Sequence, residues 1–187
     1  MKLQKVISIC NASKNITLFN DESKNEQWVT DGIGVYRLDG YPRMSVDQLL
    51  NLFGIPEDRK GKYSYKESAF PATYDFSDYQ QEENAVEPHF ISIVTGGRKY
   101  IPITLQNGTC YFAEEYFKPF ANDKGGYQLY ERVTADGKSY IIIKEGMFAV
   151  FLPQDGHTAG ANLQLSGVRI LSVLTEGVGF SLVKAAF

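Results

Sequence analysis

Residues that favour turns recur at short intervals along this chain and divide it into short apolar runs. Gly96-Gly97 and Asp136-Gly137 separate neighbouring runs, and such pairs supply the positive φ angles that a tight β-hairpin turn requires. Short runs bounded by Gly, Asn, Asp or Pro are typical of strands joined by hairpins. The sequence therefore predicts antiparallel strands instead of alternating strands and helices.

The expected strands cover residues 3–9, 15–19, 33–38, 89–94, 98–105, 109–112, 129–133, 139–144, 147–152, 168–174 and 178–184. One helix is expected at residues 46–53, because Ser45 and Gln48 have the capping-box spacing and Gly54 supplies the stop. Short helical turns are expected at residues 57–60 and 114–117. These elements predict a strand-rich α+β fold, either an antiparallel sheet or a partly open barrel of hairpins with one or two short helices.

Residues 63–90 differ in composition from the rest of the chain. They hold six acids, one base and seven aromatic residues, a net charge of −5, against −3 for all 187 residues. The remainder is thus about +2. Periodicity fades here and Pro71 interrupts it, so residues 63–88 are expected to be an acidic-aromatic excursion across the surface, with a pair of edge strands as the alternative. Strands and a short helix precede it in residues 1–62 and hairpins follow in residues 89–187, all within one domain.

The sequence contains no motif for metal binding or nucleophilic catalysis. The only histidines and cysteines, His89, His157, Cys10 and Cys110, are widely scattered, whereas a metal site needs three or four converging ligands. There is no GxSxG elbow beside a base and no phosphate-binding glycine loop. We therefore expect a protein that is not an enzyme and that uses no cofactor and no metal.

The chain also shows no sign of a membrane location. Its first apolar run breaks at Asn11, well short of a signal peptide, and no run reaches the roughly 18 apolar residues of a membrane helix. Two cysteines in the whole chain fit a reducing compartment. We expect a cytoplasmic protein without a membrane partner.

Two short basic clusters are candidates for nucleic-acid contact. They consist of Arg59, Lys60 and Lys62, and of Arg98, Lys99 and Tyr100. Lysine and arginine neutralise phosphates, and a tyrosine ring stacks on bases. The alternative is a solvated loop together with an edge strand guarded by charge.

The acidic-aromatic segment is the stronger candidate for a binding surface. Twelve tyrosines are more than a core readily accommodates, because each buried phenol needs a hydrogen-bond partner. The predicted protein-binding residues are Tyr74, Asp75, Phe76, Asp78, Tyr79, Glu82, Glu83 and Glu87. In the alternative interpretation the aromatic rings pack inward and the acids stay solvated.

Two stretches carry a resemblance to known sequences. One comprises CNASKNITL at residues 10–18, QWVTDG at residues 27–32 and FGIPEDRK at residues 53–60, and the other is LYERVTADGKSYI at residues 129–141. They resemble small proteins carried by phages and integrative elements of Firmicutes. The resemblance implies a bacterial cytoplasm and, by analogy of context, an inhibitor of host defence of the anti-CRISPR type.

Three hypotheses follow for the function. The first is a non-enzymatic protein-binding inhibitor of a host defence system, such as a CRISPR effector nuclease or its guide complex. The second is a nucleic-acid-binding accessory protein of the mobile element, and the third is an enzyme with an unfamiliar site.

Overall fold

The computed structural model describes residues 1–77, 79–121, 126–144, 148–151 and 169–172. The helices are α1 (Leu3–Ser13), α2 (Val46–Leu52), α3 (Glu57–Lys60) and the 3-10 helix η1 (Glu114–Phe120). The strands are β1 (Asn15–Asp21), β2 (Glu26–Thr30), β3 (Gly34–Arg37), β4 (Ser64–Ala69), β5 (Asn84–Val86), β6 (Ile91–Thr95), β7 (Arg98–Leu105), β8 (Gly108–Ala113), β9 (Gln128–Val133), β10 (Ser139–Lys144), β11 (Phe148–Phe151) and β12 (Arg169–Ser172). The expected strand at residues 178–184 lies outside the described residues.

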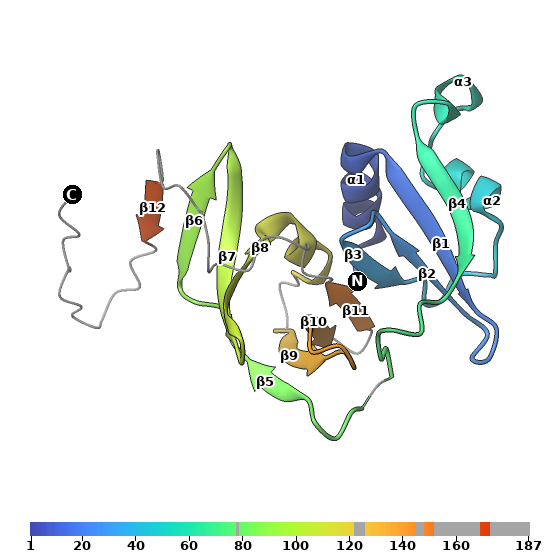
Figure 1. Ribbon diagram of the computed structural model, residues 1–187. Coiled ribbons are helices and arrows are strands. Elements are labelled where there is room, and N and C mark those ends of the chain that lie inside the picture. Colours follow the sequence, from blue (N-terminus) through green and yellow to red (C-terminus); the bar gives the residue numbers. More distant parts are fainter. Residues whose placement is uncertain (78, 122–125, 145–147, 152–168, 173–187) are drawn as a thin grey trace, which may run out of the picture.

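The strands form two sheets (Figure 1). The larger has the order β4-β1-β2-β3-β11-β10-β9-β5, and the smaller has the order β12-β6-β7-β8. Neighbouring strands are antiparallel except β4, which runs parallel to β1. The described strands form no closed barrel, because β4 and β5 end the larger sheet without pairing to each other. The predicted strand-rich α+β class is confirmed.

The hairpins form where the turn residues predict them. Strands β6 and β7 join at Gly96 and Gly97, whose φ angles are 56° and 74°. The turn between β9 and β10 places Gly137 at φ 81°. Glycine populates this region without the steric cost that a Cβ atom imposes.

The prediction of a strand at residues 3–9 is wrong, because these residues belong to helix α1. Leu3, Val6, Ile7 and Cys10 follow the i, i+3, i+4, i+7 spacing of one helical face, and the last three are buried. Lys14 ends the helix in the left-handed conformation, and its N–H donates to the carbonyl of Cys10 at 3.0 Å. Burial of this face outweighs the strand preference of valine and isoleucine.

The two helical segments around residues 46–60 are confirmed. Gln48 N–H donates to Ser45 Oγ, and Ser45 N–H donates to Gln48 Oε1, so the capping box is complete. The turn at residues 57–60 is α3. The helix expected at residues 114–117 also forms, but η1 continues through Pro119 to Phe120.

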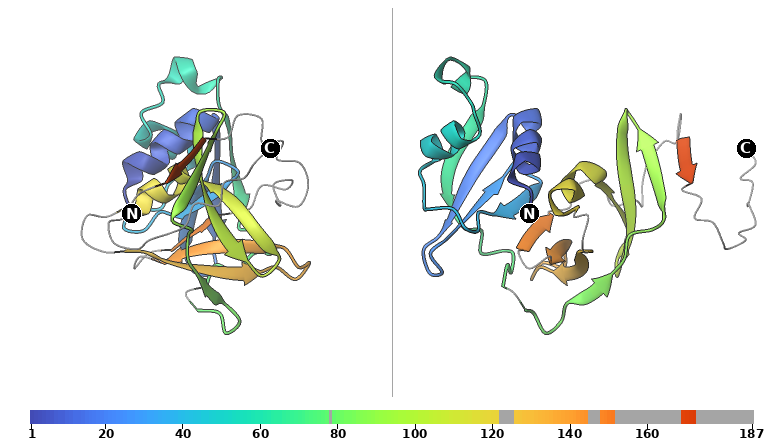
Figure 2. Two further views of the ribbon diagram at one scale, coloured as in Figure 1. Left: turned by 90° about the vertical axis from the view of Figure 1, so that its left-hand side faces the viewer. Right: turned by 180° about the vertical axis from the view of Figure 1, so that it is seen from behind.

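The main core lies between the two sheets. Helices α1 and η1 occupy this space, with the smaller sheet on one side and β1–β3 on the other (Figures 1 and 2). Val6 of α1, Ile16 of β1, Ile103 of β7 and Phe120 of η1 are all fully buried members of this core. Side chains from both sheets therefore pack against the two helices that lie between them.

Residues 63–90 connect the two ends of the larger sheet. They begin with edge strand β4 and reach edge strand β5, as the alternative interpretation of this segment predicts. Residues 70–83, called the crossing segment below, pass from one end to the other (Figure 1). Phe70, Tyr74 and Phe76 of this segment join a second core with Trp28, Val35, Tyr140 and Ile142. The segment thus covers the face of the sheet that the main core leaves free.

Candidate functional site

The aromatic residues in the first half of the crossing segment face inward. Phe76 is 6% exposed and lies with its ring centroid 5.2 Å from that of Trp28 and 4.3 Å from that of Phe70. Tyr74 packs edge-on against Tyr140 at 5.2 Å. Phe76 is therefore part of the core, and Tyr74 offers a partner only its outer side.

Glu83 holds the end of the crossing segment to the sheet. Its Oε2 accepts from Nη2 and Nε of Arg132 at 2.6 and 3.0 Å, and its Oε1 accepts from Lys144. The Arg132 side chain is 0% exposed. Burial raises the pKa of Glu83, but bonds from Lys144 and Arg132 outweigh it, so the net pKa is lowered. Both carboxylate oxygens of Glu83 therefore already accept hydrogen bonds from cations of the same chain.

The backbone of Asp75 is fixed at the same place. Its N–H donates to the Tyr140 hydroxyl at 3.0 Å, and its carbonyl accepts from Arg132 Nη1 at 2.8 Å. Its carboxylate accepts from the N–H of Ser77 at 2.8 Å. Burial raises the pKa of Asp75, yet the Ser77 bonds and the Arg132 charge outweigh it and lower the pKa overall. The carboxylate remains exposed.

Among the exposed residues of 79–91, the large apolar or aromatic ones and the acidic ones are called the outer rim below. It consists of Tyr79, Glu82, Glu87, Phe90 and Ile91, all exposed. Tyr79 is 73% exposed, Phe90 88% and Ile91 49%. Asp78 lies outside the described residues. Of the predicted protein-binding residues, Asp75, Tyr79, Glu82 and Glu87 are each exposed, whereas Phe76 and Glu83 are not.

The residues of the outer rim precede and follow β5 in the sequence, and β5 lies at the periphery of the molecule. In Figure 1 and in both views of Figure 2, β5 lies at the lower end, away from the helices. After β5, the N–H of His89 donates to the carbonyl of Pro102 at 2.9 Å, and the chain enters β6. The same stretch therefore pairs first with the larger sheet through β9 and then with the smaller sheet through β7.

Nothing in the sequence pattern marks Phe90 and Ile91 as contact residues. Residues 90–94, Phe-Ile-Ser-Ile-Val, do not alternate cleanly between apolar and polar, so the pattern does not reveal which side chains face outward. Pro88 gives the available signal, because proline within a strand pattern indicates an edge.

The two basic clusters lie on separate elements. Lys60 of α3 is buried and pairs with Asp47 at 3.2 Å and with Glu57 at 2.7 Å, and these bonds raise its pKa. Lys99 of β7 pairs with Glu114. The remaining members are Arg59 in α3, Lys62 just after it, and Arg98 and Tyr100 on β7. Helix α1 lies between α3 and the β6–β7 turn in Figure 1, so the clusters do not form one surface.

A buried polar cluster near α1 serves the fold. The Asp31 carboxylate accepts from the N–H groups of Ile33 and Gly34 at 3.0 and 2.9 Å and from the Tyr116 hydroxyl at 2.9 Å. Burial and the Asp31 charge raise the pKa of Tyr116. The carboxylate thereby fixes the turn before β3 and joins it to η1.

Within the described part of the chain, no three His, Cys, Asp or Glu side chains gather as metal ligands. None of the described helices is long and apolar enough to cross a membrane. Comparisons with protein-family models, curated proteins and solved structures give no match. The exposed aromatic and acidic side chains of the outer rim make it the candidate binding surface.

Proposed function

We propose that this chain is a non-enzymatic protein-binding protein and that its outer rim contacts a basic surface of the partner. The observation that carries this proposal is the exposure of three large side chains, Tyr79, Phe90 and Ile91, within one short stretch of the chain. Large exposed apolar side chains, rimmed by polar ones, are typical of protein interaction sites. Glu82 and Glu87 supply negative charge that no basic residue of this stretch balances.

The charge of the surface indicates the kind of partner. Carboxylates on an exposed rim favour lysine and arginine on the other protein and increase the association rate. A groove that receives a nucleic-acid backbone has this basic character. The acidic rim and the resemblance to proteins of mobile elements together suggest the partner. We propose that the chain inhibits a bacterial defence enzyme, such as a CRISPR effector nuclease or its guide complex, in the cytoplasm of the host.

The test is a pull-down from bacterial lysate, with mass spectrometry of the captured proteins. Phe90→Ser should reduce affinity for the captured partner about 30-fold, since a central aromatic anchor contributes about 2 kcal/mol. The E82Q/E87Q double variant should weaken capture and flatten its dependence on salt. Leu52→Ser on α2 and Asp58→Asn on α3 are matched controls, because both residues are exposed elsewhere on the molecule.

Equal capture by the Phe90→Ser protein and the Leu52→Ser protein would disprove the role of the outer rim. Retention of nucleic acid alone, lost steeply with salt, would instead support the accessory-protein hypothesis. Lys60 and Lys99 weigh against that second function, because each is engaged by acids of the same chain.

A further inference from the structure

We propose that the partner adds an extended basic segment as a strand to the outer edge of β5. This inference rests on the proposed function and specifies how the outer rim binds. Strand β5 is the last strand of the larger sheet. Asn84, Ala85 and Val86 pair with β9 on one side, and no described strand pairs with the other side.

An edge strand carries unpaired backbone donors and acceptors. Successive residues of an antiparallel strand direct these groups to opposite sides. One of Asn84 and Ala85 therefore directs its N–H away from β9, and both residues are exposed. A peptide that adds to such an edge gains main-chain hydrogen bonds, while flanking side chains give specificity.

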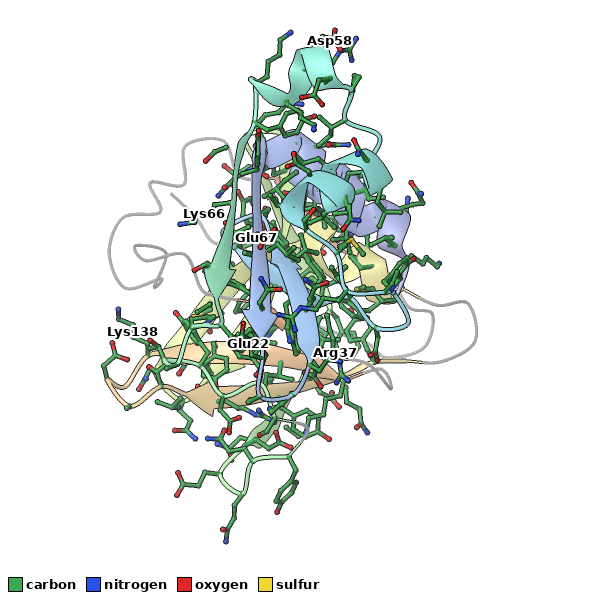
Figure 3. All side chains as sticks on the ribbon, turned by 90° about the vertical axis from the view of Figure 1, so that its right-hand side faces the viewer. Glu22, Arg37, Asp58, Lys66, Glu67 and Lys138 are labelled. Carbon is green, nitrogen blue, oxygen red and sulfur yellow. The ribbon has the colours of Figure 1, made fainter. Side chains whose placement is uncertain are left out.

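The two ends of the larger sheet differ in how they are protected. Strand β4 carries Lys66 at its centre, on the opposite side of the strand from Glu67 (Figure 3), and an exposed lysine is a common guard of an edge. Glu67 is engaged, since its Oε1 accepts from the N–H of Val46 at 2.6 Å. Residues 79–91 contain no lysine or arginine. Pro88 limits the free edge to β5 and Glu87, because proline has no N–H to donate.

The flanking side chains define the chemistry of the added segment. Glu82 comes before β5 in the sequence and Glu87 directly after it, and both are exposed. Glu83, by contrast, is paired with Arg132 and Lys144. A segment placed along β5 thus meets one free carboxylate near each end. Alternating lysines and β-branched residues match this arrangement, because they combine positive charge with a preference for extended backbone.

The experiment uses the isotope-labelled full chain and a synthetic octapeptide of alternating lysine and valine. Titration should shift the backbone amide signals of residues 84–87, and deuterium exchange of the outward amide should slow on binding. An octapeptide of alternating glutamate and valine should produce neither change. The E82Q/E87Q double variant should bind the basic peptide roughly fivefold more weakly. Shifts confined to β4, or no shifts at all, would overturn the proposal.

Two proline variants separate strand addition from simple charge attraction. Of Asn84→Pro and Ala85→Pro, the variant that loses an outward N–H should keep its melting temperature and lose about tenfold in peptide affinity. If that variant binds like the wild type while E82Q/E87Q binds weakly, strand addition is wrong and the acidic contact of the proposed function stands. If both variants unfold, deuterium exchange of the wild-type protein with the basic peptide bound decides between the alternatives. Strand addition is wrong if the backbone amides of residues 84–87 exchange as fast with the peptide as without it. The lysate pull-down tests the proposed function independently.

Discussion

Arg132 shows how a single residue joins two distant parts of this chain. Its guanidinium donates to the Glu83 carboxylate and to the Asp75 carbonyl, so it holds the crossing segment at two points. No part of its side chain is exposed. A buried cation needs such partners, because an unpaired charge in the interior is strongly destabilising.

Arg132→Met should lower the free energy of unfolding by about 3 kcal/mol, because it leaves Glu83 with Lys144 as its remaining cation. The R132M/E83Q double variant should recover part of this loss, since it also removes the buried carboxylate charge. Urea unfolding measures both effects. Lys138→Met is the control on the same hairpin, because its pair with Asp136 is exposed and contributes at most about 1 kcal/mol. Equal losses for R132M and K138M would contradict the role of Arg132.

The lowered pKa values of Glu83 and Asp75 predict a loss of stability in acid. The unfolded chain binds protons near the ordinary values of 4.5 for glutamate and 3.8 for aspartate, whereas the folded chain binds them at lower pH. The stabilisation is therefore complete above about pH 5 and declines as pH falls through these values. Glu83→Gln should be less stable near pH 7 and should show a shallower decline between about pH 5 and pH 3. Urea unfolding across this range checks the slope, and parallel curves for both proteins would contradict it.

At the scale of the elements, turn chemistry predicts the hairpins well and apolar runs predict helices poorly. The β6–β7 and β9–β10 turns depend on local glycine conformations, which a sequence displays directly. Residues 3–9 contain both an apolar run and a helical spacing, and a short run of this kind fits either element. The surroundings decide between them, because α1 buries its apolar face against the core between the sheets.

The candidate site was predictable in part for the same reason. Composition locates the acidic-aromatic segment, in which Tyr79, Glu82 and Glu87 are exposed. Composition does not show that Phe76 packs on Trp28 or that Glu83 meets Arg132. These contacts join residues that are 48 and 49 positions apart, and no local pattern specifies them.

At the scale of the whole molecule, the crossing segment separates two roles that its composition mixes. Its first half closes the second face of the larger sheet, whereas its second half contributes Tyr79 and Glu82 to the outer rim, which continues after Glu83. Both ends of the larger sheet are therefore joined by a single piece of chain (Figure 1). This arrangement makes the inner aromatic rings important for stability and leaves the outer ones free for a partner.

Phe76→Ala and Tyr79→Ala test this division directly. Phe76→Ala should lower the free energy of unfolding by about 3–5 kcal/mol, because it leaves a cavity beside Trp28 and Phe70. Tyr79→Ala should change it by at most about 0.5 kcal/mol, as an exposed side chain does, and should weaken capture of the partner instead. Urea unfolding and the lysate pull-down on both variants distinguish the two effects. If Tyr79→Ala destabilised the fold as much as Phe76→Ala, the segment would not be divided into a structural half and a binding half.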